Sequence, residues 1–182
     1  KVSLTIHPKK TQLMACLYGD QQDKTYSNLI AKWNRDKECQ VFVAGTPIEY
    51  VKEIKYLDTW ITYNLSTRRA ANAASDGARV RYYGIRDSPL ASGSATLANC
   101  RDFLLGKVRA KLEYMYTAFP PTDQDLETCG HQRIIDKALF HLLHLPPHRS
   151  NAHNLRSVFG VWTQGERRDL LLIRYWFRLC CA

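Results

Sequence analysis

The chain has 182 residues, and 45% of them are hydrophobic, which allows one packed domain or two small ones and excludes a disordered protein. No run of 18 apolar residues occurs, so the sequence predicts no membrane-spanning helix. The formal net charge is +9, and residues 61–182 contain 17 basic against ten acidic side chains, compared with nine and seven in residues 1–60. This uneven basic surplus favours a polyanionic partner, most often a nucleic acid.

The first part of the chain, residues 1–65, carries patterns typical of β structure. An apolar alternation at Val2–Ile6 and an apolar run at Leu13–Tyr18 predict two strands. Residues 19–37 are polar and predict a loop or a short helix. We therefore expect a β-rich region that contains at most a little helix.

Two further patterns complete the β-rich region. Val41 and Val43 lie on one side of a predicted strand, and the turn signal Ala-Gly-Thr-Pro follows them directly. The apolar pattern returns at Ile48–Val51, so the segment predicts a β-hairpin. Residues 54–62, IKYLDTWIT, are rich in β-branched and aromatic side chains and predict one more strand.

In residues 66–182 the apolar residues recur at helical spacing. Capping residues, glycines and prolines predict five helices: from Ser66 or Thr67 to about Tyr83, from about 95 to 118, from the capping box Thr122-x-x-Asp125 to the prolines at 146–147, from Ser150 or Asn151 to about Gly160, and from the capping box Thr163-x-x-Glu166 to the end. Strands followed by helices predict an α+β fold, with a small antiparallel β region (1–65) and a helical bundle (66–182).

Basic side chains recur on three of the predicted helices, and two lysines occupy a turn near the start. These are the candidate nucleic-acid contacts: Lys9, Lys10, Arg68, Arg69, Arg79, Arg81, Lys107, Arg109, Lys111, Arg167, Arg174 and Arg178. Guanidinium groups pair well with phosphate because their donors form a planar fork, and such contacts carry no sequence information. The alternative is that these are ordinary solvated helix faces. Aromatic residues among them either stack on unpaired bases or pack in the core.

The last helix gives the most specific expectation of this kind. Arg167, Arg174 and Arg178 are spaced so that they share one helix face. Leu170, Ile173 and Phe177 are expected to turn toward the core. The helix would then present a row of guanidinium groups to a phosphate backbone.

Histidines and cysteines offer only a weak case for a metal site. His141, His144, His148 and His153 lie close in sequence, but two prolines separate the first pair from the second, so a partly exposed basic helix end is expected and no zinc or other cofactor. The six cysteines are scattered without a CxxC pair, which predicts a reducing, intracellular compartment and is compatible with a mitochondrion or a nucleus.

Catalytic patterns are missing from the sequence. No two aspartates are adjacent, and the patterns GxxxxGK[ST], GxSxG and HExxH do not occur. Two-metal nucleotide chemistry needs clustered carboxylates to hold the ions. We therefore expect no catalytic residues and no enzymatic activity in this chain by itself.

Four segments resemble a known family. VSLTIHPKKTQLM (2–14) and VFVAGTPIEYVKEIKYLDTWIT (41–62) are similar to the end of the palm in reverse transcriptases of non-LTR (LINE-like) retrotransposons. The later segments KVRAKLEYMYTAF (107–119) and LPPHRSNAHNLRSVFGVWTQGERRDLLLIRYWFRL (145–179) are similar to the thumb and the region that follows it, so the resemblance covers nearly the whole chain. His7 stands where the family usually has Asn, and Asp58 where it usually has Gly.

The resemblance implies roles for a few residues. The lysine that corresponds to Lys10 lies near the phosphates of the incoming nucleotide in the family, and the hairpin ending at Tyr56 and Leu57 grips the primer. The fingers and the metal-binding aspartates of the family would precede Lys1. The chain therefore resembles the part of a reverse transcriptase that holds nucleic acid, without the part that polymerises it.

The expected function is a non-catalytic RNA-binding module derived from a reverse transcriptase. We expect a structural subunit of a ribonucleoprotein, such as a divergent organellar ribosome, with ribosomal RNA or an RNA–DNA hybrid and other protein subunits as partners and no membrane. One alternative is a fragment of an active retroelement RNA-directed DNA polymerase whose catalytic aspartates lie in another chain. Another is a protein–protein scaffold whose basic face is only solvated.

Overall fold

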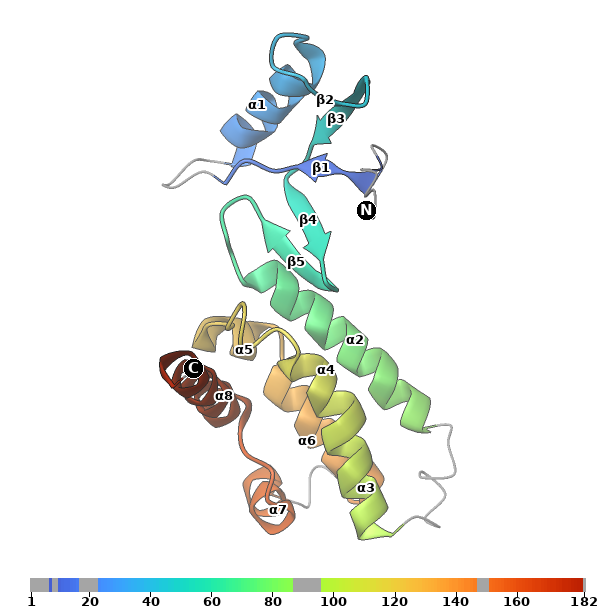
Figure 1. The fold of residues 1–182 in the computed structure, drawn as a ribbon. Coiled ribbons are helices and arrows are strands. Elements are labelled where there is room, and N and C mark those ends of the chain that lie inside the picture. The colour runs from blue at the N-terminus through green and yellow to red at the C-terminus, as the bar shows by residue number, and fades with distance from the viewer. Residues whose placement is uncertain (1–6, 8–9, 17–22, 87–95, 147–150, 182) are drawn as a thin grey trace, which may run out of the picture. The chain divides into compact units, whose positions relative to one another are not determined.

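The protein is described by a computed structural model, which covers residues 7, 10–16, 23–86, 96–146 and 151–181. A small β region precedes a mostly helical region, and the predicted α+β class is confirmed (Figure 1). The chain forms two compact units, Lys1–Ser66 and Thr67–Ala182, so the division falls one residue after the expected boundary. The strand expected at Val2–Ile6 lies outside the described residues.

The first unit is built around the strand β3 (Thr46–Tyr50). β2 (Val41–Val43) pairs with it in antiparallel register, Val41 opposite Ile48, and this confirms the predicted hairpin. Ala44 and Gly45 form its turn with φ of 49° and 76°, the left-handed conformation that tight hairpin turns require. The short strand β1 (Gln12–Leu13) is parallel to β3 on the other side.

A helix of 13 residues, α1 (Asp23–Arg35), occupies the segment for which a loop or short helix was expected. Its Asn34 clamps the strand: the Tyr50 N–H donates to Asn34 Oδ1 at 2.9 Å, and Asn34 Nδ2 donates to the Tyr50 carbonyl at 3.1 Å. Its Tyr26 is fully buried and stacks on Tyr63, with ring centroids 3.9 Å apart. This helix therefore contributes Tyr26 to the small core of the unit, whose other buried apolar residues are Ile48 and Tyr63.

The segment predicted as one strand at 54–62 is a hairpin, so that prediction was wrong. β4 (Glu53–Tyr56) and β5 (Thr59–Thr62) pair in antiparallel register, with Tyr56 opposite Thr59. Leu57 and Asp58 form the turn with φ of 45° and 63°. Asp tolerates this left-handed conformation but Leu rarely adopts it, and the segment lacks the glycine that usually marks such a turn.

The second unit opens with two long helices. α2 (Arg68–Arg86) matches the first predicted helix. The second runs without interruption through α3 (Leu97–Phe103), η3 (Leu104–Arg109) and α4 (Ala110–Glu113), and its middle part has the wider π-helical turn, in which the Ala110 N–H donates to the Leu105 carbonyl. The long amphipathic helix was expected, but the π segment was not.

Four further helices complete the unit: α5 (Asp123–Thr128), α6 (His131–Leu142), α7 (Ala152–Phe159) and α8 (Gln164–Cys180). The single helix predicted after Thr122 is two helices, because Gly130 adopts a φ of 69° between them. Both predicted capping boxes are present, at Thr122 with Asp125 and at Thr163 with Glu166. Among the residues that the structure describes, no helix is long and apolar enough to cross a membrane.

The core of the second unit lies between α2, the α3–η3–α4 helix and α6. Small alanines on α2 let the helices approach closely, and the larger side chains come from the other two. The buried cluster contains Ala78, Cys100, Leu104, Val108, Leu112, Ile134, Ile135, Ala138, Leu139, Leu142 and Val161. The candidate site described below lies on the outer side of the contact between α2 and the α3–η3–α4 helix.

A buried polar network ties the start of α8 to this core. The Tyr116 hydroxyl lies 2.8 Å from His131 Nδ1 and 3.0 Å from Gln164 Oε1. His131 Nε2 lies 3.0 Å from the Ala71 carbonyl of α2. Burial lowers the pKa of the His131 imidazole below its usual value, so the ring is held neutral, with Nε2–H donating to the carbonyl.

The orientation predicted for the last helix was wrong. Ile173 is 53% exposed and Phe177 is 64% exposed, whereas Leu170 is half-buried. The large apolar side chains in the second half of α8 are therefore left mostly uncovered by the described residues. The apolar spacing indicated a face but not what that face contacts.

Candidate nucleic-acid interface

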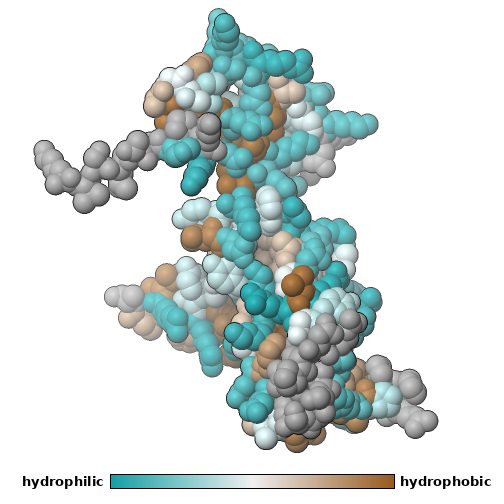
Figure 2. Space-filling view, turned by 90° about the vertical axis from the view of Figure 1, so that its right-hand side faces the viewer, coloured by the Kyte–Doolittle hydropathy of each residue, from teal (hydrophilic) through white to brown (hydrophobic). Residues whose placement is uncertain are grey.

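A groove of about 510 Å³, the α2–α4 groove, lies between α2 and the helix that packs beside it. One wall is α2 and the other is the α3–η3–α4 helix, and these helices are in direct contact below the groove. The lining residues are Gly77, Val80, Arg81 and Gly84 from α2 and Phe103, Lys107 and Lys111 from the facing helix. The side of the helical region that carries α2 is mostly hydrophilic, with apolar residues in small separate patches (Figure 2).

Three cationic side chains converge on this groove, and none of its seven lining residues is acidic. Arg81 comes from α2, Lys107 from η3 and Lys111 from α4. All three were predicted contacts, but nothing in the sequence indicated that they meet. Cations that share a groove raise the local positive potential and attract an anion such as phosphate.

The spacing of the basic residues on the facing helix explains which of them reach the groove. Lys107 and Lys111 are four residues apart, so they lie on the same face of the helix. Arg109 follows Lys107 by two residues and therefore points to the other side, where it is only 7% exposed. The prediction of Arg109 as a phosphate contact is corrected, because its guanidinium pairs with Glu113 inside the unit.

Glycine on α2 shapes the wall that faces Lys111. A Cβ added at Gly77 would lie 2.6 Å from Lys111 Cε, so the glycine leaves the space that the lysine side chain occupies. Lys111 Nζ also lies 6.0 Å from the centre of the Tyr114 ring, a favourable cation–π distance. Gly84, seven residues after Gly77, has nothing within 4 Å of where its Cβ would be, so the wall stays open there.

Arg167 is also engaged inside the unit. Its Nε lies 3.0 Å and 3.1 Å from the two carboxylate oxygens of Glu113, the same residue that holds Arg109. One carboxylate thus holds two guanidinium groups, and through Arg167 it joins α4 to α8. A contact between Arg167 and phosphate stays a prediction.

The other predicted cations of α2 lie away from the groove. Arg79 pairs with Asp76 on its own helix at 3.1 Å, an exposed contact of small energetic value. Arg68 and Arg69 are exposed at the start of the helix. The four arginines of this helix therefore point in several directions, and of them Arg81 lines the groove.

The remaining predicted cations lie elsewhere. Arg174 and Arg178 are exposed on the second half of α8 and do not line the groove. Lys10 is exposed in the first unit, and Lys9 lies outside the described residues. The structure thus groups three of the predicted contacts and separates the rest.

The predicted primer-gripping residues lie at the tip of the β4–β5 hairpin. Tyr56 is the last residue of β4, and Leu57 is the first residue of the turn. The two side chains are 61% and 69% exposed. An ion pair of 2.7 Å between Lys55 and Asp58 spans the same turn.

The histidines do not gather. His141 is half-buried in α6, with its ring edge-on to Tyr82, whereas His144 is exposed after the helix ends. His153 is exposed on α7, and His148 lies outside the described residues. No group of three potential metal ligands occurs within the described ranges.

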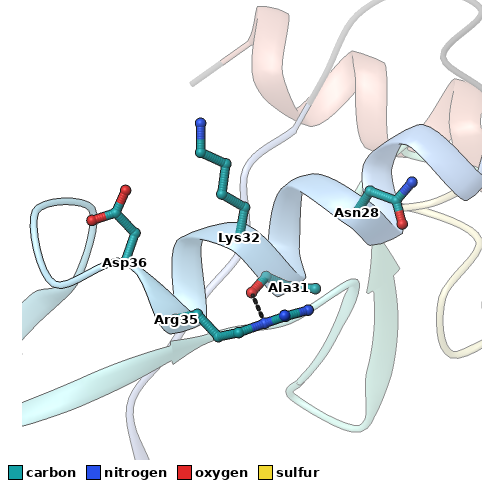
Figure 3. A pocket seen from close by; sticks show the side chains of 5 residues that line it. All are labelled: Asn28, Ala31, Lys32, Arg35 and Asp36. Carbon is teal, nitrogen blue, oxygen red and sulfur yellow. Dashed lines mark hydrogen bonds between the residues drawn. The ribbon is translucent and has the colours of Figure 1, made fainter.

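A second depression, of about 480 Å³, was not anticipated from the sequence. It lies along one side of α1 in the first unit and is lined by Asn28, Ala31, Lys32, Arg35 and Asp36. Figure 3 shows Lys32 extended away from the helix and Arg35 folded back along it, where Arg35 Nε donates to the Ala31 carbonyl at 3.1 Å. The carboxylate of Asp36 offsets part of the positive charge, so this depression suits a polyanion less well than the α2–α4 groove.

The groove between α2 and the α3–η3–α4 helix can bind and orient an anion. Two ammonium groups and one guanidinium provide charge and hydrogen-bond donors, and the lining contains no nucleophile–base pair for catalysis. Such a set of donors matches a phosphate backbone better than a single small anion, because the donors come from separate turns of two helices. Comparison of the chain with protein-family models, curated proteins and solved structures finds no match.

Proposed function

We propose that the protein is a nucleic-acid-binding module that holds an RNA strand by its phosphate backbone in the α2–α4 groove. The observation that carries the proposal is the convergence of Arg81, Lys107 and Lys111 on one groove whose lining contains no acidic residue. The +9 net charge, concentrated in the helical part of the chain, supports it. Contacts of this kind bind any sequence of suitable shape.

The resemblance to the thumb of non-LTR reverse transcriptases supports RNA, or an RNA–DNA hybrid, over duplex DNA. We propose a non-catalytic role, as a structural subunit of a ribonucleoprotein such as a divergent organellar ribosome. In that setting basic helices neutralise phosphates of ribosomal RNA, and neighbouring protein subunits cover other surfaces.

The test compares two variants that lose the same charge. Arg81→Gln/Lys107→Gln/Lys111→Gln empties the groove of cations, whereas Lys24→Gln/Lys37→Gln/Lys52→Gln removes three exposed lysines of the first unit. Binding of fluorescent single-stranded RNA, RNA–DNA hybrid and duplex DNA of equal length is measured by anisotropy at several salt concentrations. Circular dichroism and urea unfolding confirm that both variants fold.

The groove variant should lose affinity for RNA on the order of 50-fold near 0.15 M salt, with a salt slope smaller by about 2, which corresponds to three released counterions. The control variant should keep the affinity and slope of the parent within a small factor. A parent chain that binds none of the three nucleic acids would refute the function. A groove variant that binds like the parent would refute the site.

A second candidate function is a fragment of an RNA-directed DNA polymerase, and the exposed β4–β5 hairpin favours it. Tyr56 and Leu57 occupy the tip, where the resemblance implies contact with a primer. A primer with a photoreactive 3′ nucleotide, annealed to an RNA template, should then crosslink to this hairpin. Crosslinks confined to α2–α4 would argue against this candidate, and in either case the chain alone should not extend the primer.

A further inference from the structure

The second half of α8 exposes a set of large apolar side chains that the described residues leave uncovered. Trp176 is 67% exposed, and its neighbours along the helix are exposed to a similar degree. The set comprises Ile173, Tyr175, Trp176, Phe177 and Leu179. Helices that are apolar over most of their circumference are normally buried, so this half of α8 is suited to a contact with another molecule.

A groove of about 570 Å³ runs beside these residues. Thr117 and Pro120 form one wall, and α8 forms the other with Leu172, Ile173, Tyr175, Trp176 and Phe177. The lining contains no charged residue. The groove therefore suits apolar side chains, in contrast to the basic groove between α2 and α4.

Two features describe the chemistry of the missing partner. Ile173, Trp176 and Phe177 are spaced i, i+3, i+4, the spacing by which one helix packs against another. Arg174 and Arg178 border this apolar surface, and the segment from residue 170 to residue 181 contains no acidic residue. A complementary partner would therefore supply both apolar and acidic side chains.

The nearest acidic residues on the same helix are already engaged. Glu166 accepts hydrogen bonds from the Thr163 backbone and hydroxyl at 2.9 Å and 2.8 Å, and so closes the capping box. Asp169 pairs with Arg168 at 2.8 Å. A second copy of this chain would bring further arginines to the contact and no unengaged carboxylate from α8, so like charges would oppose that pairing.

We infer that the second half of α8 is the docking surface for an acidic amphipathic helix of another protein. Apolar side chains of the partner enter the groove beside Trp176, and its Asp or Glu side chains pair with Arg174 and Arg178. Unpaired RNA bases are less suitable occupants, because a base pressed into an uncharged apolar groove leaves the polar atoms of its edge without partners. This inference does not depend on RNA binding in the α2–α4 groove.

The test is a peptide selection that assumes nothing about the natural partner. The full chain is immobilised, and a phage library of random 16-residue peptides is selected on it, with counter-selection on Ile173→Gln/Phe177→Gln. Enriched sequences should place Leu, Ile, Phe or Met at positions i, i+3 or i+4 and i+7, and they should carry more Asp and Glu than Lys and Arg.

A synthetic peptide of the enriched sequence then reports on single features of the surface. Its affinity should fall by at least about tenfold for Ile173→Gln/Phe177→Gln, and by about threefold, more at low salt, for Arg174→Gln/Arg178→Gln. Val158→Gln, which changes an exposed apolar residue of α7, should leave the affinity unchanged. The arginine variant leaves the apolar surface intact, so it tests charge pairing without a change in packing.

Four outcomes would overturn the inference. The first is a selection that enriches no sequence, and the second is enriched peptides without an acidic surplus. The third is self-association of the parent chain in sedimentation that Ile173→Gln/Phe177→Gln abolishes. The fourth is loss of single-stranded RNA binding in that variant when the parent binds no peptide. The third outcome would assign the surface to a second copy of the chain, and the fourth to stacked bases. The groove between α2 and α4 is tested separately, by Arg81→Gln/Lys107→Gln/Lys111→Gln.

Discussion

The two halves of α8 differ more than their sequence suggests. The first half is held by polar contacts: the Thr163–Glu166 capping box, the buried Gln164, and Arg167 on Glu113. The second half, from Ile173 onward, has large apolar side chains and yet is exposed. A helix can thus be anchored by buried hydrogen bonds at one end, while its apolar residues remain available to a partner at the other.

The anchored half depends most on Glu113, so replacement of this residue should give the largest effect. In Glu113→Gln the guanidinium of Arg109, which is buried, loses its ionic partner, and Arg167 loses its link to α4. We expect a loss of about 3 kcal/mol in the free energy of unfolding, because breaking a buried ion pair leaves a charge without compensation. Urea unfolding measures it, with the exposed Glu127→Gln as control. A loss as small as that of the control would show that Glu113 does not anchor α8.

Acid should lower the free energy of unfolding through His131, which belongs to the polar network at the start of α8. The folded state holds this imidazole neutral, with a pKa below the value of about 6.5 that it has in the unfolded chain. The unfolded chain therefore binds more protons, and stability should be full above pH 6.5 and fall as the pH drops below it, by at most about 1.4 kcal/mol per pH unit for one group.

Urea midpoints between pH 7.5 and pH 5 measure this slope. His131→Gln should flatten it, whereas His153→Gln, at an exposed position on α7, should leave it unchanged. The interval lies above the range in which Asp125 titrates: burial disfavours its charge, but hydrogen bonds from Thr67 and Thr122 outweigh this and lower its pKa. If the urea midpoint of His131→Gln still falls between pH 7.5 and pH 5, a titratable group other than His131 causes the pH dependence.

The cap of α8 should contribute less than its buried contacts. Thr163→Ala removes the hydroxyl that accepts the Glu166 N–H and should lower stability by about 1 kcal/mol. Thr128→Ala, at the exposed end of α5, is a matched change without a cap and should have little effect. Equal losses in the two variants would mean that the capping box does not contribute to stability.

The smallest effect is expected in the exposed half of α8. Ile173→Gln/Phe177→Gln should change the free energy of unfolding of the isolated chain by no more than about 0.5 kcal/mol, because neither side chain is buried. Thermal and urea unfolding measure it. A loss of several kcal/mol would show that the chain covers this surface itself, and the docking inference would fail with it.

Local signals were enough to predict most helix ends. The Thr122 and Thr163 capping boxes, the Asn151 cap and the terminating Gly160 all occur where the sequence indicated them, because each depends on hydrogen bonds within one turn of chain. The α+β class followed from the order of the apolar periods. The hairpin at Leu57 and Asp58 escaped prediction because a left-handed Leu carries no local signal.

The candidate interface follows partly from the sequence and partly from the tertiary structure. The sequence by itself determined that Lys107 and Lys111 share a helix face, and that the helical part of the chain is strongly basic. Only the tertiary structure decided that Arg81 meets them, that Arg109 and Arg167 are used internally by Glu113, and that Ile173 and Phe177 are exposed. The physical reason is that the spacing of residues sets the direction of each side chain around its own helix, whereas its surroundings depend on which other helix packs there.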